Sequence, residues 1–137
     1  MTIDFSWMRL SNWESAIGTS NHITNAFDEI ENIIEGPQFP KTWSITLNFE
    51  GNYLQDKGVE LLVDFIKGND TLNSNVVKID VSNNRFTKES LDAMKSLLES
   101  CTKLTCLDLS INYLSAQEVD AAFAEFTRGS AVQFSAI

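Results

Sequence analysis

The stretch Leu104-Thr105-Cys106-Leu107-Asp108-Leu109-Ser110-Ile111-Asn112-Tyr113-Leu114 decides the fold that we predict for this chain of 137 residues. Counted from Leu104, apolar residues stand at positions 1, 4, 6 and 11, and an asparagine stands at position 9. The same arrangement occurs twice upstream, with Asn84 and Asn52 at the ninth position. These asparagines are 32 and 28 residues apart, so the chain contains an internal repeat.

Each copy of the repeat contains two apolar residues two positions apart, which predicts a short strand with one buried face. The pairs are Leu47/Phe49, Ile79/Val81 and Leu107/Leu109. Because side chains alternate across a strand, the residues between and beside these pairs belong to the opposite face. The asparagine follows where the chain must turn, and its amide can satisfy backbone groups that would otherwise be buried without a partner.

A helical pattern follows each predicted strand. Apolar residues fall on one helical face over residues 56–67, 88–100 and 116–126. Thr87 and Ser115 stand at the expected starts of the last two helices, and Ser115 with Glu118 fits a capping box. Gly68 and Gly129 mark helix ends. The units therefore alternate strand and helix, which predicts an α/β fold with parallel strands.

Two segments resemble the leucine-rich repeats of the ribonuclease-inhibitor-like subfamily. They are Leu54-Gln55-Asp56-Lys57-Gly58-Val59-Glu60-Leu61-Leu62 and Cys101-Thr102-Lys103-Leu104-Thr105-Cys106-Leu107-Asp108-Leu109-Ser110. The resemblance covers roughly residues 43–137. It implies a short right-handed β-α superhelix, a solenoid whose parallel sheet has about four strands and whose helices lie on the convex face. Proteins of this family share a scaffold and not a ligand, so the partner does not follow from the resemblance.

We expect residues 1–40 to form an N-terminal helical cap and residues 41–137 to form about three repeats and a terminal strand. Trp7, Leu10, Trp13 and Ile17 have helical spacing, and a clearer amphipathic helix begins at Thr24. A cap of this kind covers the end of a solenoid. The alternative is that Trp7 and Trp13 form an exposed aromatic anchor for a partner. We interpret residues 68–75 as a polar loop.

Charge and composition restrict the partners. The formal net charge is −9, with 19 acidic and 10 basic residues, which disfavours nucleic acid and anionic membranes and favours a basic protein. The sequence shows no long apolar run and no signal-peptide layout. We therefore expect a cytoplasmic protein, or one exported without a cleavable signal peptide.

Strand alternation predicts a polar sheet face and an exposed edge as the binding surface. Asp80, Asp108 and Glu50 are expected to lie close together and to suit a Lys or Arg side chain of a partner. Tyr and Arg after each asparagine are common binding anchors. The predicted partner-binding residues are Asn48, Glu50, Tyr53, Lys78, Asp80, Arg85, Asp108, Ser110, Tyr113 and Gln133.

No catalytic role, cofactor or metal site is expected. His22 is the single histidine, and the sequence contains no phosphate-binding glycine loop and no metal-spaced Cys/His cluster. Three carboxylates on a sheet lie in rows, whereas Ca²⁺ or Mg²⁺ needs about six oxygens around one point. We expect an adaptor that binds another protein. The alternatives are an acidic inhibitor or immunity-type protein that neutralises a basic enzyme, and a subunit that forms homodimers through residues 131–137.

Overall fold

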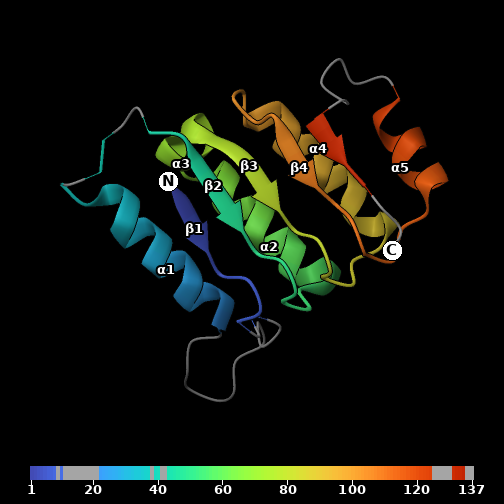
Figure 1. Cartoon of the computed structure of the whole chain (residues 1–137), viewed down its shortest axis with the longest axis horizontal. Helices are drawn as coiled ribbons and strands as arrows, with labels where there is room; N and C mark the ends of the chain where they lie inside the picture. The colour runs from blue at the N-terminus through green and yellow to red at the C-terminus, as the bar shows by residue number, and fades with distance from the viewer. Residues whose placement is uncertain (9, 11–21, 38, 41–42, 125–130, 135–137) are drawn as a thin grey trace.

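The chain folds around a five-stranded sheet in which every strand is parallel to its neighbours and the strand order follows the sequence. The structure is a computed structural model, which describes residues 1–8, 10, 22–37, 39–40, 43–124 and 131–134 (Figure 1). The strands are β1 (Thr2–Asp4), β2 (Ile45–Asn48), β3 (Val76–Asp80), β4 (Cys106–Asp108) and β5 (Val132–Gln133). This arrangement confirms the predicted α/β fold with a parallel sheet.

Helices alternate with the strands. They are α1 (His22–Glu35), α2 (Gln55–Lys67), α3 (Asp70–Asn75), the 3₁₀ turn η1 (Lys88–Ser90), α4 (Leu91–Ser100) and α5 (Ala116–Phe123). Figure 1 shows α2 and α4 behind the sheet, which leaves the opposite sheet face uncovered by these helices. The predicted caps are present: the Thr87 side chain accepts the Glu89 N–H, and Ser115 with Glu118 forms a capping box. In the described residues, no helix is both long and apolar enough to cross a membrane.

The buried layer between sheet and helices has the predicted periodicity. Leu47, Ile79 and Leu107 stand side by side on β2, β3 and β4, and each is fully buried. The helices contribute residues such as Leu62 and Leu97, which have at most 1% of their surface exposed. Burial of this apolar layer is the main force that holds helices and sheet together.

Strand β1 was not predicted. From the sequence we expected about four strands, and a helix from Trp7 onward as part of the N-terminal cap, whereas the structure has a fifth strand at Thr2–Asp4. Ile3 pairs with Leu47 in parallel register, and Trp7 and Met8 lie in a turn after the strand. The first ten residues repeat the spacing of the next unit, since Ile3, Phe5 and Leu10 correspond to Leu47, Phe49 and Leu54. Met8 stands where Asn52 stands, which is why the asparagine pattern missed this unit.

The amphipathic helix predicted from Thr24 is confirmed as helix α1. Ile23, Phe27, Ile30 and Ile34 form its buried stripe. Trp7, by contrast, was expected to be covered and is 56% exposed. Trp13 and Ile17 lie outside the described residues.

The predicted loop over residues 68–75 contains a short helix instead. The Asn69 side chain caps helix α3 by accepting the Leu72 N–H at 3.0 Å, and Leu72 is fully buried. An asparagine cap and one well-placed apolar side chain are enough to form a single buried turn in a polar segment. Helix α5 ends at Phe123, and residues 125–130 lie outside the described part.

The repeated asparagines join each unit to the unit before it. Asn84 is fully buried, and its Oδ1 accepts the N–H groups of Asn52 and Leu54 at 2.9 and 3.2 Å. Its Nδ2 donates to the carbonyl oxygens of Phe49, Val81 and Ser82. One side chain therefore satisfies five backbone groups in two successive turns.

The same pattern holds one unit upstream and one unit downstream. Asn52 Oδ1 accepts the N–H groups of Met8 and Leu10, and Asn112 Oδ1 accepts those of Asn84 and Phe86. The predicted role of these asparagines is thus confirmed. We call this series of hydrogen bonds from Asn52, Asn84 and Asn112 the asparagine ladder. Through Asn52 it also holds the turn after β1, although that turn has no asparagine of its own.

Candidate functional site

The open face of the sheet bears a row of polar side chains at the end of the strands. Parallel pairing places Asp4 beside Asn48, Asn48 beside Asp80, Asp80 beside Asp108, and Asp108 beside Gln133. We call these five residues the polar row. The neighbourhood of Asn48, Asp80, Asp108 and Gln133 confirms the predicted register, and Asp4 adds a carboxylate that sequence reasoning missed.

Four members of the polar row have the same structural duty, which is to turn the chain after its strand. Oδ1 of Asp4, Asn48, Asp80 and Asp108 accepts the backbone N–H two residues later, at 2.9 to 3.0 Å. In Asp4 the hydroxyl and then the backbone N–H of Ser6 hold the pKa of the carboxyl below its ordinary value. These turns are Asx-turns, in which a side chain takes the place of a backbone acceptor.

The negative charge is not required for this duty. Asn48 makes the same turn bond with a neutral amide, at 3.0 Å to the Glu50 N–H. Asp80 and Asp108 nevertheless bring two carboxylates onto adjacent strands, where like charges repel. Their charge is therefore available for something other than the turn.

Glu50 is held in a small hydrogen-bonded group beside the polar row. Its Oε1 accepts the indole N–H of Trp7 at 3.2 Å, and its Oε2 accepts the Ser82 hydroxyl at 3.4 Å. Ser82 is 4% exposed, and its hydroxyl lies within hydrogen-bond distance of both Glu50 Oε2 and Asp80 Oδ1. The Trp7 ring lies over Gly51, where a Cβ would come within 2.4 Å of it.

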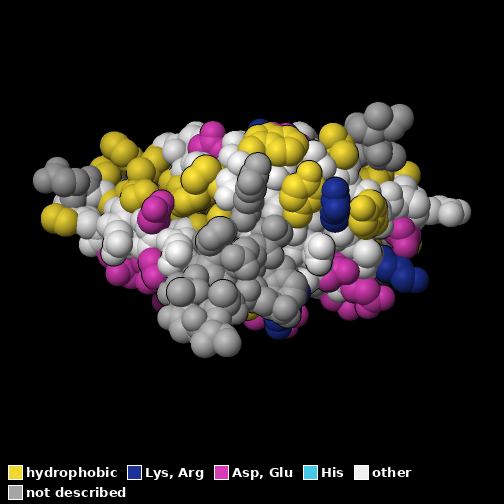
Figure 2. Space-filling model, turned by 90° about the horizontal axis from the view of Figure 1, so that it is seen from below, with side chains coloured by type: hydrophobic (Ala, Val, Ile, Leu, Met, Phe, Trp, Pro, Cys, Tyr) yellow, Lys and Arg dark blue, Asp and Glu magenta, His cyan; other side chains and the backbone are white. Residues whose placement is uncertain are grey.

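The loops that follow β1 to β4 present an exposed edge that we call the rim. Arg85 and Tyr53 form its centre, with the guanidinium carbon 4.1 Å from the centre of the Tyr53 ring. Figure 2 views the molecule from the end of the sheet where the strands finish, and shows hydrophobic side chains gathered beside a basic one. The residues of the rim are Trp7, Met8, Tyr53, Arg85, Ile111 and Tyr113.

The remaining predicted residues lie at the two ends of this surface. Lys78 is exposed and pairs in register with Cys106, two residues before the polar row on each strand. Burial raises the pKa of the half-buried Cys106 thiol, Lys78 lowers it, and Asp108 and Asp80 raise it further, with a raised pKa as the net result. Ser110 donates its N–H to Asp108 in the last described turn.

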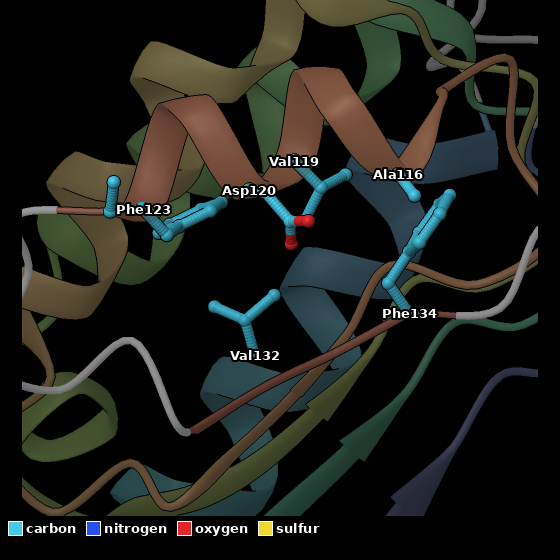
Figure 3. A pocket seen from close by; sticks show the side chains of 7 residues that line it. Ala116, Val119, Asp120, Phe123, Val132 and Phe134 are labelled. Carbon is cyan, nitrogen blue, oxygen red and sulfur yellow. The ribbon is translucent and has the colours of Figure 1, made fainter.

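A hollow of about 570 Å³ lies between helix α5 and strand β5 (Figure 3). Val119 and Phe123 of α5 form one side, and Val132 and Phe134 the other. The Asp120 carboxylate points into the space between them. This hollow is where the last helix and the last strand of the described chain meet without a further unit packed on them.

Asp56 is a polar link between units that sequence reasoning missed. Its carboxylate accepts the Thr87 N–H at 2.8 Å, the Thr87 hydroxyl at 2.9 Å and the Ser90 hydroxyl at 2.6 Å. Partial burial raises the pKa of Asp56, but the bonds from Ser90 and Thr87 outweigh it, so that its pKa is lowered from the ordinary value. The carboxylate thus ties the start of α2 to the start of the next helical segment.

We expect Asp56→Asn to lower stability at neutral pH and to have a smaller effect in acid. Because the folded-state pKa is below the unfolded one, the carboxylate stabilises the fold above its ordinary pKa and loses this effect as the pH falls through the folded value. Urea unfolding of both proteins between pH 7 and about pH 3 measures this. Asp64→Asn, at an exposed position of the same helix, is the control. A difference that stays constant over this range would contradict the assignment.

No group of three or more His, Cys, Asp or Glu side chains is placed to hold a metal ion within the described residues. Every buried side-chain nitrogen and oxygen in that part of the chain has a hydrogen-bond partner. The members of the polar row are not among these buried groups, because they are exposed or half-buried.

Comparison of the chain with models of protein families and with curated protein sequences found no match.

Proposed function

We propose that the protein is a short leucine-rich-repeat solenoid that binds another protein through the polar row and the rim. The repeat spacing, the parallel strand order and the asparagine ladder support this scaffold. In such a scaffold the sheet lines the concave side and α2 and α4 the convex side. The role is non-catalytic, and the partner is a protein and not nucleic acid or a membrane.

The proposal depends on the negative charges of Asp80 and Asp108, which the turns themselves do not require. Asn48 shows that the turn needs only an acceptor oxygen, yet two adjacent strands have carboxylates in that position. Side by side in a sheet, like charges cost stability. A Lys or Arg side chain of a partner would remove this repulsion and bind both carboxylates.

The overall charge points to a basic partner. With a formal net charge of −9, the protein attracts basic surfaces over long range and speeds their encounter. An inhibitor or immunity-type protein that neutralises a basic enzyme is a narrower form of this proposal. It predicts the same salt dependence, together with loss of the enzyme's activity in the complex.

Replacing both carboxylates by their neutral isosteres tests the proposal. Asp80→Asn/Asp108→Asn keeps the two turn acceptors, as Asn48 shows, and removes two charges. The partner is the protein that the immobilised wild type retains from native lysate and the Asp80→Lys/Asp108→Lys variant does not. We expect its dissociation constant to rise about tenfold or more in the Asn variant at low salt, and this difference to shrink at high salt.

Asp64→Asn, which removes one exposed carboxylate from helix α2, is the matched control and should leave binding unchanged. Unfolding in urea must show that the double variant is at least as stable as the wild type, because the repulsion between the two carboxylates is removed. Capture of the same proteins by wild type and both double variants, with equal salt dependence, would contradict the proposal.

Self-assembly is the second candidate, because β5 is the last strand of the described sheet and the hollow beside it is lined by apolar side chains. An open strand edge can pair with a second copy of the chain. The Asp120 carboxylate in the hollow would be repelled by its copy in a second chain, which opposes close approach of two such surfaces. Light scattering that finds a monomer at high concentration would remove this candidate.

A further inference from the structure

The exposed apolar side chains of the protein gather in the rim. Eight large hydrophobic side chains are exposed in the described residues, and five of them belong to the loops that follow β1, β2 and β4. Tyr113 is 64% exposed, and Ile111 is 45% exposed. Single exposed apolar residues need no explanation, but a contiguous group at one edge marks an interaction site.

Backbone conformation provides a second, independent observation. The residue before each asparagine of the ladder has a left-handed backbone: φ is 73° at Gly51, 56° at Asn83 and 54° at Ile111. Trp7, before Met8, has φ 56°. Glycine and asparagine tolerate this conformation, whereas a β-branched residue is strained in it.

Ile111 therefore lowers stability twice, once through its backbone and once through its exposed apolar surface. Two other units of this protein fill the same position with Gly51 and Asn83, so the turn itself does not require isoleucine. Strained residues of this kind persist where the side chain serves a function.

Two aromatic members of the rim, Trp7 and Tyr53, are held by contacts with other side chains or backbone atoms. Trp7 rests on Gly51 and donates its indole N–H to Glu50, and Arg85 stacks on Tyr53. Rigid, exposed Trp, Tyr and Arg side chains bind partners at a small cost in conformational entropy.

Arg85 gives the rim a positive charge that makes no ion pair in the described part of the chain. Among the described residues, no carboxylate lies within the 4.0 Å of an ion pair from its guanidinium. A guanidinium stacked on an aromatic ring still presents its N–H groups at its edge, where they bind a carboxylate with two hydrogen bonds.

We infer that the rim binds an extended segment of the partner protein in which apolar side chains flank an Asp or Glu that pairs with Arg85. This inference rests on the proposed function and specifies the chemistry of its partner. The basic groups that meet the polar row and the acidic group that meets the rim then fix the orientation of the bound segment.

The size of the rim sets the length of this segment. The loops after β1 and β4 are three strand spacings of about 4.8 Å apart, so about five extended residues cross the rim. A displayed library of random peptides of about seven residues, each long enough to cross it, is therefore a suitable probe. Wild type should select peptides with an acidic residue between apolar ones.

Two variants decide the test. Arg85→Glu should change the selected residue from acidic to basic. Ile111→Asn, which copies Asn83, should weaken the best wild-type peptide about tenfold, although it raises the melting temperature by about 3 °C through relief of backbone strain. A gain in stability together with a loss of binding separates a binding role from a structural one. Asn32→Ala, at an exposed position of α1, is the control for both measurements.

The other outcomes overturn either the inference or the proposed function, and they can be told apart. If no peptide is selected, if selection ignores Arg85, or if Ile111→Asn lowers the melting temperature, the rim does not bind such a segment. If the rim variants bind the natural partner as wild type does while Asp80→Asn/Asp108→Asn weakens it, the inference fails and the proposed function stands. If the carboxylate variants alone are without effect, the proposed role of the polar row fails.

Discussion

Asn84→Ala should lower the free energy of unfolding by about 4 kcal/mol or more, because buried backbone groups left without a partner cost about 1–3 kcal/mol each. The amide of Asn84 bonds five backbone groups in two successive turns, and the residue is fully buried. Since small domains are stable by about 5–15 kcal/mol, this loss amounts to about a quarter of the total stability or more. Urea unfolding followed by circular dichroism measures the loss.

Two comparisons show that the bonds are the cause. Asn84→Asp keeps the shape and the acceptor but replaces the three donor bonds by an oxygen that faces carbonyl groups, so it should be at least as destabilising at neutral pH. Asn32→Ala removes an exposed asparagine from α1 and should change stability by less than about 0.5 kcal/mol. If Asn84→Ala were as mild as this control, the ladder would not hold the units together.

Phe49→Ala is expected to lower the free energy of unfolding by about 4 kcal/mol, the range seen for buried phenylalanines. Phe49 is fully buried, and its ring stacks on Phe5 with the ring centres 5.6 Å apart. Its removal leaves a cavity between β2 and the loop after β1, so β1 should lose protection first. Hydrogen exchange of the β1 amides, compared with those of β4, tests this order.

A conservative variant serves as the control. Phe49→Leu keeps most of the volume and should cost less than about 1.5 kcal/mol. Equal exchange of β1 and β4 in Phe49→Ala would show that the sheet opens as one unit, and would contradict a separate loss of the first strand.

The fold was predictable to the extent that it repeats. Asn52, Asn84 and Asn112 revealed the units, and the alternation of apolar residues placed Asp80 beside Asp108. Both features depend on local periodicity, which a sequence displays directly. The α/β class, the helices α2, α4 and α5, and the polar row apart from Asp4 followed from them.

Strand β1 was missed because its unit has Met8 in place of the asparagine and because a long segment separates it from the next unit. The spacing of Ile3, Phe5 and Leu10 was the available signal. A short strand is stabilised by its neighbour, and here the Asn52 side chain supplies bonds to the turn from 42 and 44 residues away. Such distant partners are invisible to a reading of local pattern.

The rim shows another limit of sequence reasoning. Tyr53, Arg85 and Tyr113 were expected at this edge, but Ile111 was not selected, because nothing in its own neighbourhood marks a left-handed backbone. The signal lay in the alignment of units, where the positions of Gly51 and Asn83 indicate the conformation that Ile111 must share. Comparison of equivalent positions between units therefore reveals strain that a single unit does not.

The direction of the ladder has a consequence for biosynthesis. Each amide completes the turn of the unit that precedes it, so a turn gains its full set of bonds only after the following asparagine has been made. As the chain leaves the ribosome from its N-terminal end, each of these turns waits between 28 and 44 residues for its closing asparagine, which at about 5–20 residues per second is a delay of about 1–9 seconds. Folding thus proceeds from the N-terminal to the C-terminal units. The most recently synthesised turn lacks its full set of hydrogen bonds and remains accessible to chaperones or to a binding partner until the next asparagine has been made.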